Sequence, residues 1–238
     1  MQEKALTFVL PEMWDDPKEN SAFFEYVKKE KTVFNKVVAM IIRDKTYCQC
    51  WSLLSESDAM WRIYSYDNKA IQLKTSFEKI KMLDNIDIVP VLYSDDLVVD
   101  VTHDKKDVLL KSFGVKRVAF EHEKEVRLVN HYRFNDFEDC EKQVRAFLAM
   151  HQHPNMVEIF ESLDCGETIE ERVKKCAELL NLGNSKKTTK KISFKDVPNF
   201  IEGVKVHPLA PDWYVEIVNE YCRRNDIDFN GRSELYLP

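Results

Sequence analysis

Hydrophobic and polar residues form their clearest pattern in the middle of the chain, at Lys116–Asn130. The first half of this stretch can turn as a helix, with Glu121 and Glu125 one turn apart. The second half alternates, with Val126 and Leu128 on one face and Glu125, Arg127 and Val129 on the other. The pattern predicts a short helix that runs directly into a half-buried strand.

The sequence pattern of the N-terminal region predicts helices and strands in mixed order. A short apolar run ends in an Asp-Asp-Pro turn, and Pro17 suits the first turn of a helix that extends to about Glu30. Val33–Ile42 is apolar and β-branched, which favours a strand paired with Thr46–Leu53. The first of these two segments is equally consistent with a buried helix.

The remainder of the chain continues this mixture. Ser55 is expected to cap a helix, and Gly114 to end one. The last helix is expected to turn Trp213, Ile217 and Tyr221 inward. Further helices are predicted at Phe77–Leu83, Lys105–Phe113, Phe137–Met150, Thr168–Leu182 and Asp212–Arg224, and strands at Lys69–Lys74, Ile86–Tyr93, Leu97–Val101 and Ile201–Val206.

Helices and strands do not alternate regularly enough for a doubly wound sheet, so the fold class is α+β. We expect one domain over residues 1–238, with a twisted, largely antiparallel sheet flanked by helices. Residues 137–191 are expected to form a helical elaboration, within which Gly183–Lys191 has the composition of a lysine-rich loop.

Composition narrows the classes of function. The 238 residues are 44% hydrophobic and 32% charged, with only 5 Gly, which is typical of a globular protein with much regular structure. The net charge of −6 argues against broad binding to nucleic acid, although Lys186, Lys187, Lys190 and Lys191 could form a local basic patch. No apolar run is long enough to span a bilayer. The six scattered cysteines favour a reducing compartment, and we expect a cytoplasmic protein.

A zinc site is the obvious metal hypothesis. Cys48 and Cys50 would share one face of a strand, and His151 and His153 could complete a tetrahedral set. The spacing does not match common zinc modules, and unpaired cysteines are ordinary core residues. We therefore predict no metal site.

Aromatic residues gather around the segment that follows Ser55. Trp51, Trp61, Tyr64 and Tyr66 could sandwich a planar ligand such as a nucleobase or nicotinamide, or could simply form core. Among these, Trp51, Trp61 and Tyr64 are the predicted ligand-binding residues.

The charged cluster in the central stretch is the best candidate for chemistry. We predict Glu123, Glu125 and Arg127 as catalytic residues, with Lys116 and Arg117 in contact with the ligand. A carboxylate in a partly dry cleft can stabilise a developing cation or act as a base. In the alternative interpretation these acids and bases form structural ion pairs. No Ser-His-Asp arrangement or phosphate-binding glycine loop is evident.

Several short motifs occur in a fixed order along nearly the whole chain. They are Trp14-Asp15-Asp16-Pro17, Cys50-Trp51-Ser52, Glu56-Ser57, Met60-Trp61-x-x-Tyr64, Lys116-Arg117-x-x-Phe120-x-x-Glu123-x-Glu125-Val126-Arg127 and Ser233-x-Leu235-Tyr236. Together they resemble a bacterial family catalogued as domain of unknown function 2971.

The resemblance implies a fold more than a reaction. Some family members lie in genomic neighbourhoods suggestive of phage defence or stress responses, and the layout is similar to ADP-ribosyltransferase-like folds. By that analogy Glu123 or Glu125 would stabilise an oxocarbenium-like centre, Trp61 or Tyr64 would line a nicotinamide pocket, and NAD is the candidate cofactor. The early strand of such a layout would have to come from Ala5–Leu10 or be missing, and Phe137–Lys191 does not align with the family pattern.

Two hypotheses follow from the sequence. The first is an enzyme that acts on a nucleotide-like small molecule. The second is a non-catalytic regulatory module whose cleft binds a ligand or a protein partner.

Overall fold

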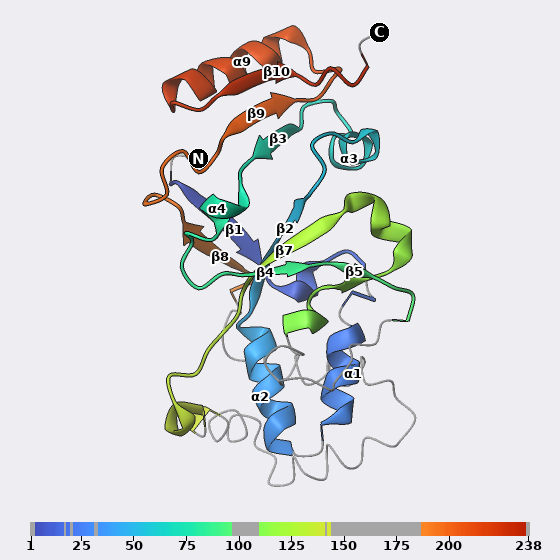
Figure 1. The fold of residues 1–238 in the computed structure, drawn as a ribbon, viewed down its shortest axis with the longest axis vertical. Helices are drawn as coiled ribbons and strands as arrows, with labels where there is room; N and C mark the ends of the chain where they lie inside the picture. The colour runs from blue at the N-terminus through green and yellow to red at the C-terminus, as the bar shows by residue number, and fades with distance from the viewer. Residues whose placement is uncertain are drawn as a thin grey trace.

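A five-stranded antiparallel sheet lies at the centre of the computed structural model (Figure 1). The structure describes residues 3–96 apart from 17, 20, 31 and 32, residues 110–143 apart from 141, and residues 187–236. The strand order is β4-β7-β2-β1-β8. The strands span Ala5–Val9 (β1), Tyr47–Ser52 (β2), Asp87–Pro90 (β4), Glu125–Asn130 (β7) and Thr189–Ser193 (β8).

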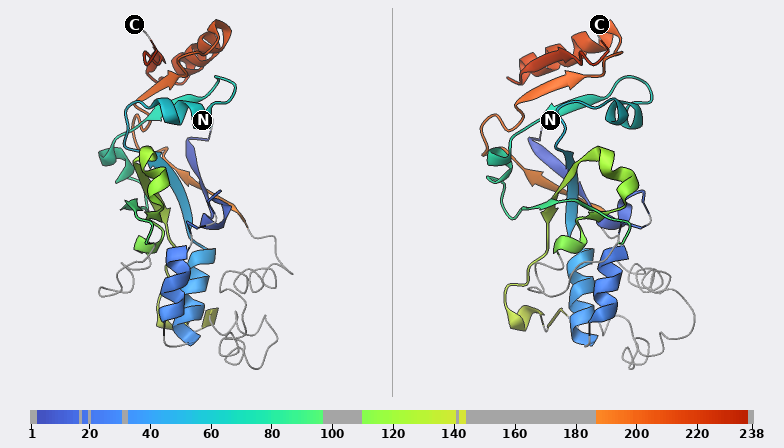
Figure 2. Two further views of the ribbon diagram at one scale, coloured as in Figure 1. Left: turned by 90° about the vertical axis from the view of Figure 1, so that its right-hand side faces the viewer. Right: turned by 45° about the vertical axis from the view of Figure 1, so that its right-hand side comes forward.

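A three-stranded sheet and a long helix form a second layer at one end of the molecule (Figures 1 and 2). This sheet has the order β10-β9-β3, and helix α9 packs against β10 and β9. These elements span Ile71–Lys74 (β3), Gly203–Val206 (β9), Asp212–Arg224 (α9) and Phe229–Arg232 (β10).

Two helices, α1 and α2, lie at the opposite end (Figure 2). Short elements connect the layers, and β5 pairs with β6 in a small parallel ladder. The remaining bounds are Pro11–Met13 (η1), Ser21–Lys29 (α1), Val33–Asp44 (α2), Asp58–Tyr64 (α3), Phe77–Ile80 (α4), Leu92–Tyr93 (β5), Val115–Lys116 (β6) and Val118–Glu123 (η2), where η denotes a 3₁₀ helix. The α+β class with a largely antiparallel sheet is confirmed.

Strand β7 is buried on both faces, so the predicted half-buried strand was wrong in this respect. Leu128 belongs to a hydrophobic cluster with Phe8 and Phe200, between the two sheets. Its neighbour Val129 belongs to a second cluster with Phe23 from α1. The predicted order of a short helix followed by a strand is confirmed, because η2 leads into β7 through Lys124.

The predicted strand at Val33–Ile42 was wrong, and the helical alternative is what the structure contains. Val37, Met40 and Ile41 are all buried, at the i, i+3, i+4 spacing of one helix face. Ser55 does not cap α3. Instead the Ser57 hydroxyl accepts a hydrogen bond from the Met60 N–H at 3.3 Å.

Helix α9 has the predicted bounds, but of the three residues expected to face inward only Tyr221 is partly buried. Trp213 and Ile217 are 54% and 58% exposed, whereas Cys222 is almost fully buried. Val218, four residues before Cys222, packs against the same core cluster. The helix therefore buries the stripe that contains Val218 and Cys222, and its aromatic first turn stays on the surface.

Part of the predicted lysine-rich loop is a strand. β8 includes Lys190 and Lys191 and pairs along the full length of β1. β1 is the early strand that was expected at Ala5–Leu10. The predicted elements at Leu97–Val101 and Thr168–Leu182, and most of the elaboration at about 137–191, lie outside the described residues. Within the described part of the chain, no helix is long and apolar enough to cross a membrane.

Gly114 is required for close packing. A Cβ at this position would lie 2.5 Å from Val89 Cγ1 and 3.1 Å from the Pro90 carbonyl oxygen. We expect Gly114→Ala to lower the free energy of unfolding by about 1–3 kcal/mol, as measured by urea denaturation, because the turn before β6 would have to move away from Val89 and Pro90 in β4.

Gly203→Ala is the matched control. The atom that its Cβ would meet is the end of the Asn230 side chain, which can rotate away. Its loss of stability should therefore be the smaller of the two, and an equal or larger loss would contradict the packing role of Gly114.

Candidate functional site

Five charged side chains meet in the interior beside β7. We call them the charge cluster, and they are Glu19, Lys116, Glu123, Glu125 and Arg127. Glu125 and Arg127 are two residues apart on β7 and so share a face. Lys124, with a left-handed φ of 43°, forms the turn that brings Glu123 beside them. All five residues are buried.

Lys116 holds three carboxylates together. Its Nζ lies 3.0 Å from Glu19 Oε1, 2.6 Å from Glu123 Oε2 and 3.1 Å from Glu125 Oε2. Burial alone would lower the pKa of Lys116, but the hydrogen bond to Glu123 and the charges of Glu125 and Glu19 outweigh it and raise that pKa. Lys116 is therefore a fixed cation inside the protein.

Arg127 is the second cation and is completely buried. Its Nε donates to Glu125 Oε1 at 2.8 Å, and a terminal nitrogen lies 3.2 Å from Glu19 Oε2. The other terminal nitrogen donates to the Phe113 carbonyl oxygen at 2.7 Å, and the guanidinium stacks 3.9 Å from the Trp14 ring centroid. These contacts make Arg127 a structural centre of the cluster.

The pKa values of the acids follow from this arrangement. Burial would raise the pKa of Glu125, but the hydrogen bonds and charge of Arg127 lower it to about 2. Burial dominates at Glu19, so the pKa of Glu19 is raised despite Arg127 and Lys116. With so low a pKa, Glu125 is a poor general base at neutral pH.

Arg117 is occupied by a separate ion pair. Its Nε and a terminal nitrogen donate to the two oxygens of Asp16 at 3.0 and 2.8 Å. Burial would raise the pKa of Asp16, but this bidentate contact lowers it. Arg117 thus anchors the segment before α1, which is the structural role in the alternative interpretation of the sequence.

Glu123 and Glu125 also border a cleft of about 410 Å³. We call it the aromatic cleft, and it is lined by Gln49, Cys50, Trp51, Ser52, Leu54, Ser57, Met60, Trp61, Tyr64, Ala70, Ile71, Gln72, Leu73, Glu123 and Glu125. No lysine or arginine is among these described lining residues. The acids therefore face the cleft, while Lys116 and Arg127 lie behind them.

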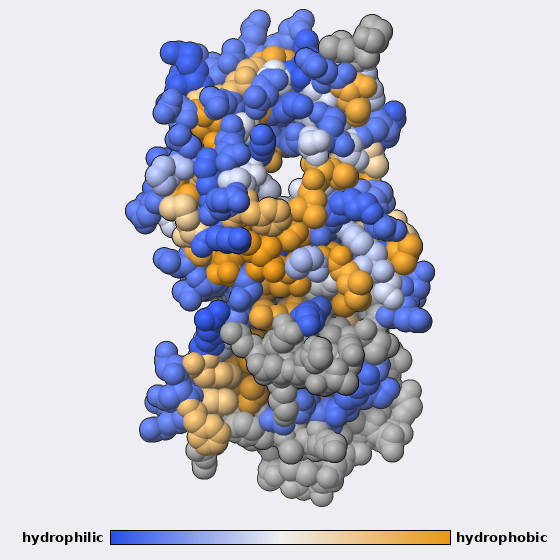
Figure 3. Space-filling model, viewed as in Figure 1, coloured by the Kyte–Doolittle hydropathy of each residue, from blue (hydrophilic) through white to orange (hydrophobic). Residues whose placement is uncertain are grey.

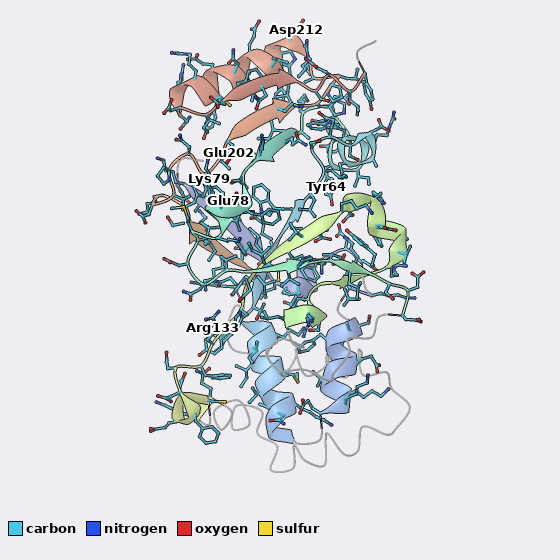
Figure 4. All side chains as sticks on the ribbon, viewed as in Figure 1. Tyr64, Glu78, Lys79, Arg133, Glu202 and Asp212 are labelled. Atoms are coloured by element: carbon cyan, nitrogen blue, oxygen red, sulfur yellow. The ribbon has the colours of Figure 1, made fainter. Side chains whose placement is uncertain are left out.

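The structure brings five of the predicted site residues to the aromatic cleft: Trp51, Trp61, Tyr64, Glu123 and Glu125. In Figure 4, Tyr64 projects from the α3 side toward the space between the two sheets. Arg127, Lys116 and Arg117 do not line it.

Trp61 is held by neighbours on its far side. Its indole N–H donates to Glu56, and its ring meets His207 edge-on with centroids 5.5 Å apart. Trp51 donates from its indole nitrogen to Gln49 at 2.9 Å. Tyr66, by contrast, is 98% exposed and is not part of the cleft. The two tryptophans are thus fixed in position before any ligand arrives.

Cys50 lines the cleft next to Glu125, but it is a poor nucleophile. Cys50 is exposed to the cleft, but the surrounding protein reduces its contact with bulk water. This desolvation and the charge of Glu125 raise the pKa of Cys50 well above its ordinary value, so the thiol stays protonated. Cys48 points into the core, where burial raises its pKa to about 12. Among the described residues, no group of three or more histidines, cysteines or acids could hold a metal ion. His151 and His153 lie outside the described residues.

Sequence reasoning missed Glu19 and the contribution of β3. Glu19 touches both cations of the charge cluster, and Ile71, Gln72 and Leu73 form one wall of the aromatic cleft. The Trp14-Asp15-Asp16 motif pointed to this segment, because Trp14 and Asp16 both contact basic residues of the central stretch.

No family model matches the chain, and no similar curated protein or solved structure was found. The resemblance to domain of unknown function 2971 stays a prediction.

Proposed function

We propose that the chain is a ligand-binding module whose aromatic cleft holds a flat, positively charged group. The observation that supports this is the lining of one cleft by two tryptophans, a tyrosine and two carboxylates, without a lysine or arginine among its described residues. Cations are attracted to the faces of aromatic rings and to carboxylates, and the attraction is stronger where water is partly excluded. The volume falls in the range of small-molecule sites.

Glu123 is the acid with capacity left for a ligand. Its Oε2 accepts from Lys116 at 2.6 Å, and its other oxygen has no protein partner in the described part of the chain. Both oxygens of Glu125 are already bonded, to Arg127 and Lys116. An incoming cation would therefore pair with Glu123, and Glu125 would add charge from behind it.

A thermal-shift comparison of N-methylnicotinamide, here the compound methylated on the pyridine ring nitrogen, with nicotinamide tests this proposal. The two rings are similar in size and flatness, and only the methylated one is a cation. A ligand that binds only the folded state stabilises it by about 2.7 kcal/mol at a hundredfold excess over Kd. We expect the cation to raise the melting temperature and nicotinamide to have a much smaller effect.

Glu123→Gln should weaken binding of the cation about tenfold, which is about 1.4 kcal/mol. Glu121→Gln is the matched control, since Glu121 pairs with Lys124 on the surface and does not line the cleft. Equal shifts with both ring compounds, or equal losses in both variants, would contradict the proposal.

The second candidate is an enzyme that acts on a nucleotide-like substrate such as NAD. It is favoured by the convergence of Glu123 and Glu125 with Trp61 and Tyr64 on one cleft, which a transferase-like layout requires. The nicotinamide ring of NAD is itself a flat cation. When the bond between ring and ribose breaks, nicotinamide leaves with the bonding electrons, and the carboxylate of Glu123 would stabilise the ribose cation until a nucleophile adds.

Release of nicotinamide from NAD separates the two candidates. Release that is lost in Glu123→Gln and kept in Glu121→Gln would favour the enzyme. Binding of NAD without release would favour the non-catalytic module.

A further inference from the structure

We infer that the flat cation recognised by the aromatic cleft is an arginine side chain, presented by an extended peptide that pairs with the open edge of β3. This inference rests on the proposed function and names the ligand class. It depends on the edge of β3, on a second cleft that continues the first, and on the distribution of charge between them.

Strand β3 is the outer strand of its sheet, next to β9 only. The Ala70 carbonyl accepts from the His207 N–H at 3.2 Å, and the Lys74 carbonyl accepts from the Glu202 N–H at 2.8 Å. Hydrogen-bonding groups alternate in direction along an antiparallel strand, so the backbone groups of Ile71 and Leu73 point away from β9. Among the described residues they have no backbone partner on that side. Such an edge is a template for strand addition.

The open edge of β3 faces a continuous groove. A second cleft, of about 620 Å³, adjoins the aromatic cleft, and the two share Trp51, Ser52, Leu54, Gln72 and Leu73. β3 and the residues that flank it line both clefts, from Ala70 in the first to Thr75 in the second. Figure 3 shows an opening through the molecule between the two sheets. In Figure 4, Tyr64 lies on one side of this opening and Lys79 and Glu202 on the other.

The two ends of the groove differ in charge. The aromatic cleft contains Glu123 and Glu125, whereas the second cleft contains Lys74, Lys205 and Arg232 together with Glu202 and Glu234. Lys205 is paired with Glu56 at 2.9 Å. Lys74 forms no ion pair with another described residue. A peptide with a cationic side chain at one end and an acidic one further along would complement both ends.

Arginine fits the aromatic cleft better than lysine. Its guanidinium is flat, stacks on aromatic rings and offers several donors to a carboxylate, whereas an ammonium is a compact, strongly hydrated charge. The protein already uses this contact once, where Arg127 stacks on Trp14 and pairs with Glu125. Side chains of a paired strand point alternately to opposite faces, so every second residue of the peptide would face the floor of the groove.

Calorimetric titration with capped peptides tests the inference on the full chain. The probe is an acetylated, amidated hexapeptide of β-branched residues with one arginine and one glutamate two positions later. We expect it to bind at least tenfold more tightly than acetyl-arginine amide. Replacement of the arginine by citrulline, which is flat but neutral, should weaken binding at least tenfold. Methylation of those backbone nitrogens of the peptide that face β3 should also weaken its binding at least tenfold.

Ile71→Pro provides the test on the protein side. The Ile71 N–H points away from β9, so proline removes an outward donor without breaking the ladder, as edge strands allow. The melting temperature should show that this variant folds. Ile71 also lines the aromatic cleft, so the comparison is between ligands. Relative to Ile71→Val, Ile71→Pro should lose at least tenfold more affinity for the peptide than for N-methylnicotinamide.

Two other outcomes would distinguish failure of strand addition from failure of the cation site. If acetyl-arginine amide binds as tightly as the peptide, or if Ile71→Pro binds the peptide normally, strand addition is wrong and the proposed cation site stands. If neither the peptide nor N-methylnicotinamide binds, the proposed function itself is wrong.

Discussion

Replacement of Arg127 by methionine should lower the free energy of unfolding by about 3–5 kcal/mol, because it leaves buried carboxylates without their main cation. Arg127 is fully buried and contacts both Glu19 and Glu125. Methionine keeps much of the side-chain length, so lost packing would contribute little. Urea denaturation of the purified variant measures the effect.

The matched control is Arg133→Met. Arg133 is half exposed and lies 3.5 Å from Asp87, a geometry that typically contributes less than about 1 kcal/mol. Figure 4 shows Arg133 well away from the labelled Tyr64. If both substitutions had similarly small effects, the charge cluster would not be a structural centre of the fold.

Acid should destabilise the protein through Glu125. Its pKa is about 2 in the folded chain, below the ordinary value of 4.5, so the stability it contributes is complete above about pH 4.5. That stability is lost as the pH falls toward 2, and a shift of this size corresponds to about 3 kcal/mol. Stability measured from pH 7 to pH 2 should therefore fall less steeply in Glu125→Gln than in the unchanged chain.

Glu19 has the opposite effect on the pH dependence of stability, so the unchanged chain has to be compared with Glu125→Gln. Its pKa is raised in the folded state, so protonation of Glu19 favours folding as the pH falls. The difference between the unchanged chain and Glu125→Gln removes this shared contribution to first order. Parallel curves for the two proteins would show that Arg127 does not lower the pKa of Glu125.

Local pattern predicted the elements around the site well. Alternation identified β7, and helical spacing identified η2 just before it. The same alternation did not reveal that β7 is buried on both faces, because Glu125 and Arg127 look like surface residues in sequence. They are buried because each neutralises the other, and periodicity carries no information about such pairing. The helix α2 was ambiguous because β-branched residues are common in both buried helices and strands.

The features that could not be predicted from the sequence depend on contacts between residues that lie far apart in the chain. The aromatic and acidic residues of the cleft were identifiable by type, and the fold brings them together. Glu19 lies far from Lys116 in sequence, and nothing in its surroundings marks it as a partner of that lysine. The open edge of β3 likewise exists only because β9, more than a hundred residues later, pairs with its other side.

The most direct measurement of the central claim is a calorimetric titration of N-methylnicotinamide into the unchanged chain, Glu123→Gln and Glu121→Gln under identical conditions. A flat cation bound in the aromatic cleft predicts saturable one-to-one binding, about tenfold weaker in Glu123→Gln and unchanged in Glu121→Gln. Saturable binding of the same strength in all three proteins would contradict the account, because the cation would then lie elsewhere.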